Sequence, residues 1–316
     1  MYKILKSSNT GVDELDIEDM EKGSWIDIVS PSAEEIDEIA KATQISKDFL
    51  TAALDREEKA RTEIDEEQLL VVIDIPFFRS NKDYDTLPLG IIVTKEVIVT
   101  VCLESNAVTS GFNAKTYKMF STYKKTRFLF QILYKSATLY LKYIRNIMRR
   151  TDDLEQHLRQ AMENSKLFSM LDLQKSLTYF TTSLRSNYMV TEKLLRLRTT
   201  PQTQQLIKLY EEDEDLLDDV IVEYKQAIEM VEMYSHIVQS MMEVFASIIS
   251  NNLNLVMRFL ASVTIILAIP TFISGLWGMN VPVPFAAMSH GFYIVFGIAC
   301  MVSLLTGFWL WKKHMF

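Results

Sequence analysis

Residues 258–280 read RFLASVTIILAIPTFISGLWGMN, and residues 292–311 read FYIVFGIACMVSLLTGFWLW. Each stretch contains about 20 consecutive uncharged residues, which at roughly 1.5 Å per residue is enough for a helix to cross a hydrocarbon core of about 30 Å. Trp277, Trp309 and Trp311 lie at the ends of these stretches, where amphipathic rings favour the membrane interface. The two stretches therefore predict two membrane-spanning helices.

Basic residues flank these spans on one side only. Arg258 precedes the first span and Lys312 and Lys313 follow the second, whereas the connection 278–291 contains no Lys or Arg. Because cytoplasmic flanks carry the excess of Lys and Arg, both termini are expected in the cytoplasm. The polar, acidic residues 1–20 lack the pattern of a cleavable signal peptide. We expect a multi-pass protein of the plasma or inner cell membrane.

The first third of the 316-residue chain has the pattern of an α/β domain. Ser30-Pro31, followed by Glu34 and Glu35, is typical of a helix start with acids in its first turn. Three stretches rich in β-branched residues predict strands: Trp25–Val29, Leu69–Phe78 and Leu89–Leu103.

The middle of the chain has a helical pattern. It begins at about Asn113 and breaks near Asn164-Ser165, which predicts two long helices that return on each other. Thr200-Pro201 is a favourable helix opening, and nothing after it stops a helix before Pro270. The result would be one helix of about 70 residues, on the order of 100 Å long.

This long helix carries an apolar seam that must be covered by other helices. The seam is covered either by the two preceding helices of the same chain or by other copies, and the periodicity favours neither. Its residues follow 3-4 spacing: Leu217, Ile221, Tyr224, Ile228, Val231, Val238, Met242, Phe245 and Ile249.

The expected fold class is therefore α+β joined to membrane α-helices. The expected order is a cytoplasmic α/β domain (1–110), a long cytoplasmic helix pair (111–200), a stalk helix (201–257), a first span (258–277), an outer loop (278–291), a second span (292–312) and a basic cytoplasmic tail (313–316).

Composition argues against several classes of function. A formal net charge of −8 does not suit a nucleic-acid binder, although it suits a surface that gathers cations. No Gly-x-x-x-x-Gly-Lys-Ser/Thr phosphate loop is present, so ATP-driven pumping has no support. The four histidines are scattered, with no nucleophile–base or metal-ligand cluster, so we expect neither an enzyme nor an organic cofactor.

A stripe of mostly small or polar residues follows one face of the first span. In an isolated helix such a stripe is more typical of a helix–helix interface, but in a ring of helices it would line the axis. Its members recur at 3-4 spacing: Asn254, Met257, Ala261, Thr264, Ala268, Thr271, Gly275 and Gly278.

The chemistry of this stripe suits a hydrated cation. No carboxylate, Lys or Arg lies in it above Arg258, which leaves the neutral oxygens of Asn254, Thr264, Thr271 and Asn280 and exposed backbone carbonyls. Such oxygens accept hydrogen bonds from water already bound to a cation. Mg²⁺ releases its water shell reluctantly, so a wide neutral ring would avoid most of its dehydration cost. Met257 and the neighbouring Leu260 are candidates for an apolar constriction.

At Gly278-Met279-Asn280 the chain resembles the CorA family of magnesium and cobalt transporters, also called two-span GMN transporters. The motif stands at the outer end of the first of two spans, in the run Pro270-Thr271-Phe272-Ile273-Ser274-Gly275-Leu276-Trp277-Gly278-Met279-Asn280. The resemblance extends over the whole chain, from the α/β domain to the basic tail.

The resemblance implies a homopentamer with a funnel-shaped cytoplasmic assembly. Gly278, Met279 and Asn280 would form the outer ring that selects hydrated Mg²⁺. Gap-free alignment back from the motif puts the family's pore-lining positions at Asn254, Met257, Leu260, Ala268 and Thr271, which differs from the stripe only in choosing Leu260 rather than Ala261.

Relatives also share an acidic cytoplasmic sensor site between subunits, and the same alignment puts its stalk aspartate at Asp219. The surrounding run of acids, from Glu211 to Asp219, suits relief by divalent cations, although such a run is also typical of a solvated helix face. Asp83 and Asp85 are candidates for the partner carboxylate from the next subunit.

The loop after the motif departs from the family pattern. Many members have a Met-Pro-Glu segment there, whereas this chain has Val281-Pro282-Val283-Pro284-Phe285, and His290 is the only ionisable side chain of the loop. The departure weakens the distinction among Mg²⁺, Co²⁺, Ni²⁺ and Zn²⁺.

The expected function is passive uptake of hydrated divalent cations, Mg²⁺ first, driven by the membrane potential and gated by cytoplasmic Mg²⁺. The expected partners are other copies of the chain, the lipid bilayer and the ions. Two alternatives stay open: a Zn²⁺ transporter of the same architecture, and a membrane-tethered scaffold or sensor without transport.

Overall fold

The computed structural model describes residues 1–8, 11–65, 67–79, 83–160, 164–197, 206–207 and 210–315. The chain divides into two compact units, Met1–Ser240 and Met241–Phe316. Helix α5, Glu211–Trp277, contributes residues to both units.

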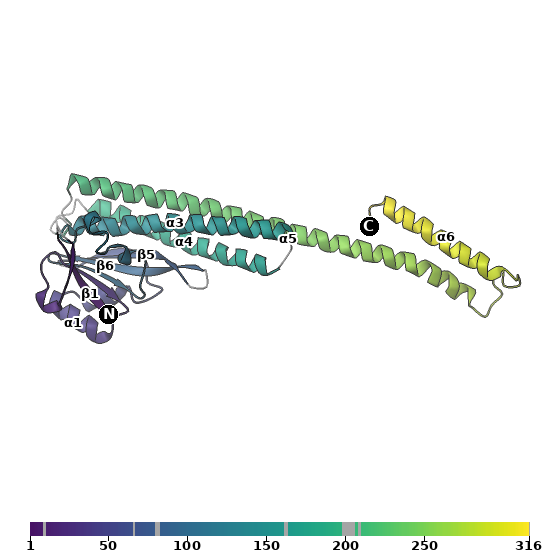
Figure 1. The fold of residues 1–316 in the computed structure, drawn as a ribbon, viewed down its shortest axis with the longest axis horizontal. Coiled ribbons are helices and arrows are strands. Elements are labelled where there is room, and N and C mark those ends of the chain that lie inside the picture. Colours follow the sequence, from purple (N-terminus) through teal and green to yellow (C-terminus); the bar gives the residue numbers. More distant parts are fainter. Residues whose placement is uncertain are drawn as a thin grey trace. The chain divides into compact units, whose positions relative to one another are not determined.

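The first unit contains a seven-stranded mixed sheet with the order β2-β1-β3-β7-β6-β5-β4 (Figure 1). β3 and β7 pair in parallel, and the other neighbours are antiparallel. The strands are β1 (Tyr2–Ser7), β2 (Val12–Leu15), β3 (Trp25–Val29), β4 (Arg61–Asp65), β5 (Gln68–Phe78), β6 (Tyr84–Thr94) and β7 (Ile98–Cys102). The predicted α/β class is confirmed, whereas β1, β2 and β4 were not predicted because they are short or polar.

Two short helices, α1 (Ala33–Thr43) and α2 (Lys47–Ala52), pack on one face of the sheet over a core of aliphatic side chains. The start of α1 is fixed by a reciprocal capping box in which the Ser32 hydroxyl accepts from the Glu35 N–H and the Glu35 carboxylate accepts from the Ser32 N–H. The predicted helix start is therefore present, with Ser32 rather than Ser30 as the cap.

Helices α3 (Lys125–Gln160) and α4 (Asn164–Leu197) cover the other face of the sheet (Figure 1). β4 pairs with β5 only as far as Val72. Beyond that point the side chain of Asn187 on α4 forms hydrogen bonds with the backbone of Asp74 on β5. Its Oδ1 accepts from the Asp74 N–H at 2.8 Å and its Nδ2 donates to the Asp74 carbonyl at 2.6 Å, while the Tyr140 hydroxyl donates to the same carbonyl. The sheet edge is thus fastened to both helices.

Two helix boundaries differ from the prediction. Residues 113–124 form turns and a short 3₁₀ helix, Tyr117–Met119, so the long helix begins at Lys125 rather than near Asn113. The long C-terminal helix begins at Glu211, and the described residues just before it, Leu206, Ile207 and Tyr210, are not helical. Thr200 and Pro201, the predicted opening of that helix, lie outside the described residues. The predicted break near Asn164 is confirmed, since α4 starts there.

The apolar seam of α5 is buried within the same chain over its first half. Leu217, Tyr224, Val231 and Val238 are fully buried against the first unit. Polar contacts fasten the helix to both neighbours: Arg185 of α4 pairs with Glu232 at 2.6 Å, and Arg127 of α3 pairs with Glu212 at 2.5 Å. Of the two alternatives for the seam, intrachain packing holds for these residues.

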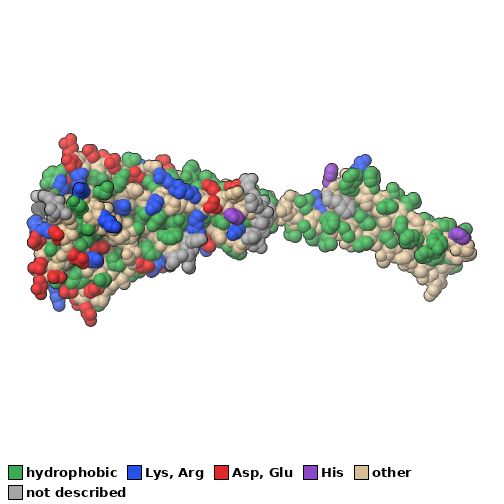
Figure 2. Space-filling view, viewed as in Figure 1, with side chains coloured by type: hydrophobic (Ala, Val, Ile, Leu, Met, Phe, Trp, Pro, Cys, Tyr) green, Lys and Arg blue, Asp and Glu red, His purple; other side chains and the backbone are tan. Residues whose placement is uncertain are grey.

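The second unit consists of the end of α5, a connecting loop and α6 (Gly291–Lys312). The described residues include two helices long and apolar enough to cross a membrane, α5 and α6, and only 6% and 11% of their most apolar windows are buried. Figure 2 shows hydrophobic side chains over this unit and charged ones over the first. Because the core helix of a soluble protein would be buried, this exposure favours membrane spans.

Candidate ion pathway

The predicted stripe lies on an uncovered face of α5. Asn254, Met257, Leu260 and the members that follow them are all exposed, and Met257 is 57% exposed. Larger apolar side chains flank the stripe, among them Phe272 at 67% exposure and Leu267 at 65%. In the described chain the stripe is therefore available to another copy, to lipid or to water.

Helix α6 packs on the opposite face of α5. Ser262 is fully buried, and its hydroxyl donates to the Arg258 carbonyl at 2.8 Å and to the Met315 carbonyl at 3.4 Å. Ile266 approaches Gly307 so closely that a Cβ at that glycine would lie 3.5 Å from Ile266 Cδ1. Ser262 and Ile266 lie roughly 120–160° around the helix from Ala268, at about 100° per residue.

Thr271 lies at the edge of the stripe rather than at its centre. It lines a small cleft of about 330 Å³ between α5 and α6, together with Ser274 and Cys300. The other predicted pathway residues do not line this cleft.

The two threonines of the stripe have a defined hydrogen-bonding role. The Thr264 hydroxyl donates to the Leu260 carbonyl at 2.8 Å, and the Thr271 hydroxyl donates to the Leu267 carbonyl at 3.1 Å. Each hydroxyl hydrogen is therefore engaged within the helix, and the oxygen lone pairs remain as acceptors. An oxygen that only accepts suits the water shell of a cation, whose hydrogens point outward.

Gly278, Met279 and Asn280 follow directly on the last turn of α5. The Gly278 N–H donates to the Ser274 carbonyl at 2.9 Å and ends the helix, and all three residues are exposed. The motif thus presents an amide side chain and backbone groups at the end of the stripe.

Two contacts fold the loop that follows the motif. The Trp277 indole N–H donates to the Pro284 carbonyl at 3.0 Å. At Gly291, a Cβ would lie 2.2 Å from the Phe285 carbonyl oxygen, so only glycine fits there without a shift. Neither Trp277 nor Gly291 was predicted from the sequence to shape the loop. A tryptophan at the end of a span, followed by two prolines, is nevertheless a pattern that could have indicated such a contact. His290, the loop's ionisable side chain, contacts the Ser289 hydroxyl at 2.7 Å.

The predicted sensor residues lie on separate elements of the first unit. Asp219 is exposed near the start of α5. Burial raises the pKa of Tyr134 on α3, and the charges of Glu223 and Asp219 add to this effect. Asp85 pairs with Arg79 at 2.7 Å, and Asp83 lies at the other strand end of the same hairpin turn.

One chain does not bring Asp219 together with Asp83 and Asp85. Figure 1 shows the adjoining ends of β5 and β6, at Phe78 and Tyr84, far along the helices from the start of α5. Among the described residues, no three His, Cys, Asp or Glu side chains are grouped so that they could hold a metal ion.

Comparisons with known proteins agree on one family. A family model described as a CorA-like Mg²⁺ transporter protein matches residues 21–313. The cobalt/magnesium transport protein CorA of Methanocaldococcus jannaschii is 29% identical over 304 residues, 93% of this chain and 91% of that protein. The complete structure of the CorA magnesium transporter from the same organism is similar with a TM-score of 0.82 at 26% identity, over 98% of this chain and 96% of that one.

A more distant likeness concerns the fold alone. The crystal structure of the ZntB cytoplasmic domain from Vibrio parahaemolyticus is 11% identical, with a TM-score of 0.59 over 79% of this chain and 96% of that one.

Proposed function

The chain belongs to the CorA family of Mg²⁺ transporter proteins, a family of membrane-embedded metal-ion transporters rather than enzymes, and on that premise we propose that it forms a homopentameric channel for hydrated divalent cations. Mg²⁺ is the proposed principal ion, with Co²⁺ and Ni²⁺ as further candidates. Five copies of α5 would surround the axis of the channel, with both termini of each chain in the cytoplasm.

One observation carries this proposal: α6 covers the face of α5 opposite the stripe and leaves the small and oxygen-bearing residues uncovered up to Gly278-Met279-Asn280. A stripe of this kind also suits packing between spans that only tether the chain, but membership in a transporter family favours the alternative, in which its acceptor oxygens face one another in a ring. In a ring they line an axis, where Thr264 and Asn280 would accept from the water shell of the ion. Met257 and Leu260 would supply the apolar constriction.

No energy source beyond the membrane potential is required. A divalent ion gains about 4.6 kcal/mol per 100 mV of inside-negative potential, from roughly 2.3 kcal/mol per unit charge. This gain is enough for uptake against a concentration gradient of about two thousandfold at that voltage, since a factor of ten is about 1.4 kcal/mol.

The test compares Asn280→Ala with Met288→Ala, which changes an exposed residue of the same loop outside the motif. Flux of Mg²⁺, Co²⁺, Ni²⁺ and Zn²⁺ into proteoliposomes is measured under an imposed potential. Asn280→Ala is expected to assemble normally but to lose at least tenfold of its Mg²⁺ flux or its preference among the ions, and Met288→Ala to behave as the unmodified protein. Unchanged flux and selectivity in an assembled Asn280→Ala protein would contradict the channel role, and preferential Zn²⁺ flux would favour the zinc alternative.

We further propose that cytoplasmic Mg²⁺ closes the channel by bridging Asp219 to a carboxylate of the next subunit, Asp83 or Asp85. Loss of the ion would leave like charges facing one another and loosen the ring. Asp219→Ala should abolish inhibition by Mg²⁺ inside the vesicle, whereas Glu229→Ala, an exposed acid later on the same helix, should retain it. Wild-type inhibition in Asp219→Ala would remove this residue from the sensor.

A further inference from the structure

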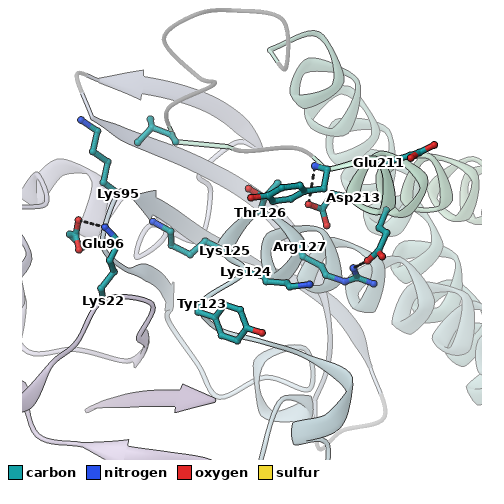
Figure 3. A pocket seen from close by; sticks show the side chains of 13 residues that line it. Lys22, Lys95, Glu96, Tyr123, Lys124, Lys125, Thr126, Arg127, Glu211 and Asp213 are labelled. Atoms are coloured by element: carbon teal, nitrogen blue, oxygen red, sulfur yellow. Dashed lines mark hydrogen bonds and ion pairs between the residues drawn. The ribbon is translucent and has the colours of Figure 1, made fainter. Parts of the chain in front are cut away.

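A cleft of about 950 Å³ lies within the first unit and shares no lining residue with the candidate ion pathway. Its walls come from the turn before β3, the turn between β6 and β7, the entry to α3 and the start of α5 (Figure 3). Five of its lining side chains are basic, in a protein whose net charge is −8: Lys22, Lys95, Lys124, Lys125 and Arg127.

Two of the four acidic side chains of the cleft pair with two of its five basic ones, and the other two are buried or directed away. Glu96 pairs with Lys22 at 2.9 Å, and Glu212 pairs with Arg127 at 2.5 Å. The Asp213 carboxylate is buried and accepts from the Tyr210 N–H at the start of α5. Figure 3 shows the Glu211 carboxylate directed away from the lysines.

Among the described residues, Lys124 and Lys125 form no ion pair with a carboxylate, although the charge of Lys124, after that of Arg127, helps to lower the pKa of Glu212. Lys95 has a partner, because it pairs with Glu67 outside the cleft. The sequence from Leu197 to Tyr210 contains no Asp or Glu, so that stretch has no carboxylate to offer them. Lys124 is exposed, whereas Lys125 is partly buried and donates to the Thr94 carbonyl.

The surroundings of Lys125 disfavour uncompensated positive charge. Burial lowers the pKa of Lys125 to about 8, with Glu96 opposing this effect and Lys22 adding to it. The same place holds the first turn of α3, which contains no acidic residue and whose N–H groups lack partners within the helix. A bound anion would relieve both costs at once.

The size and aromatic lining of the cleft indicate an anion larger than one phosphate. Its volume lies in the range of sites for nucleotide-sized ligands. Tyr123 and Tyr210 also line it and are 60% and 67% exposed, which leaves ring surface for a planar group.

We propose that this cleft binds a polyphosphate group, with phosphate oxygens on Lys124, Lys125 and the first N–H groups of α3, and that its natural source is a nucleoside triphosphate whose base lies against Tyr123 or Tyr210. The proposal is independent of ion flux, so it stands or falls separately from the channel function.

The test is calorimetric titration of the full-length protein in detergent, in buffer free of divalent ions, with ATP, tripolyphosphate and orthophosphate as separate ligands. ATP and tripolyphosphate are expected to bind, and orthophosphate at least tenfold more weakly because it reaches fewer amines. A tripolyphosphate affinity close to that of ATP would favour inorganic polyphosphate as the source. Absence of binding by both polyphosphates to the folded protein would overturn the proposal, as would binding of ATP alone.

Variants locate the site. Lys124→Glu should weaken both polyphosphates at least tenfold, whereas Lys115→Glu, the same charge change at an exposed lysine outside the cleft, should alter them less than twofold. Lys125→Gln provides a second variant that keeps a donor near the Thr94 carbonyl. Tyr123→Ala should weaken ATP but not tripolyphosphate. Equal losses in Lys124→Glu and Lys115→Glu, or no loss in either Lys124→Glu or Lys125→Gln, would contradict the placement of the phosphates.

Discussion

The two halves of α5 are one continuous helix in two different environments. Up to Ser240 many of its apolar residues are buried, as with Tyr224 and Val231, and its exposed residues are largely charged, with Val222 and Met233 as exposed apolar exceptions. From Asn251 to Trp277 most residues are exposed although most are apolar. Exposure therefore has opposite meanings along the same helix: contact with water in the first half, and contact with lipid or other copies in the second.

The two halves of α5 also differ in what holds them in place. In the first half, side-chain contacts to α3 and α4 hold it within its own chain, through Glu212 and Glu232. In the second half α6 covers one face only, so the remaining apolar surface must be covered by lipid or by other copies of the chain.

Removing a buried ring from the first half should be the most damaging change. Tyr224 is fully buried, so Tyr224→Ala leaves a cavity and should lower the free energy of unfolding by about 3–5 kcal/mol. Val222→Ala, at a position 61% exposed on the same helix, should change it by less than about 0.5 kcal/mol. Thermal unfolding of the purified proteins measures both, and similar losses would show that the first half does not depend on intrachain packing.

A charge should separate the two kinds of exposed position. Val222 and Leu267 are similarly exposed, at 61% and 65%. Leu267→Lys places an amine in hydrocarbon and should disfavour insertion by about 2.5–3.5 kcal/mol, whereas Val222→Lys should be nearly neutral. The fraction of protein that resists extraction from membranes measures this. Equal extraction of the two variants would mean that the second half does not lie in lipid.

Two glycines of α6 should respond differently to one added methyl group. A Cβ at Gly291 would meet the Phe285 carbonyl at 2.2 Å, whereas at Gly297 nothing lies within 4 Å. Gly291→Ala should therefore displace the loop after the motif at a cost of about 1–3 kcal/mol and reduce ion flux. Gly297→Ala should leave stability and flux unchanged, and a larger effect there would point to a contact that only the assembly makes.

Stability of the first unit should depend on the protonation of Asp74. Burial raises the pKa of its carboxyl above 3.8, with the Ser183 hydrogen bond opposing this effect. The native state therefore keeps the proton to higher pH than the unfolded chain, so stability falls as the pH rises from about 3.8 through the raised pKa and is level above it.

Asp74→Asn should remove this fall and become progressively more stable than the unmodified protein across that window, by about 1.4 kcal/mol for each unit of the raised pKa. The Asp74 backbone contacts to Asn187 and Tyr140 are retained in this variant. Asp48→Asn, at an exposed site, is the control. Thermal midpoints between pH 4 and 7 measure the difference, and parallel curves for Asp74→Asn and the unmodified protein would contradict it.

Much of the fold could be predicted because its signals are local. The spans follow from uninterrupted apolar composition, and the resemblance to the CorA family, carried by Gly278-Met279-Asn280 and its position, is confirmed by the family match. The start of α5 was misplaced at Pro201 because helix propensity alone does not mark where tertiary contacts begin. The edge strand β4 was missed because its polar residues gain their order from pairing with β5.

The candidate pathway was predictable as a pattern but not as a surface. The 3-4 spacing of small and polar residues identified the stripe from Asn254 to Gly278, whereas the roles of Leu260, Ala261 and Asp219 stay predictions until flux is measured. The amines of Lys124 and Lys125 went unnoticed because their surroundings come from four separate segments of the chain.

Three features are already written in the order of the residues: the division of the chain into a charged part and an apolar part, the placement of the motif after the first span, and the face on which acceptor oxygens recur. These features depend only on composition and on the period of a helix, which neighbouring residues specify. Three others became known from the folded chain: α6 covers the face opposite this stripe, Trp277 and Gly291 shape the loop, and lysines distant in sequence share one cleft. Such relations depend on how distant segments pack, and packing is a property of the whole fold.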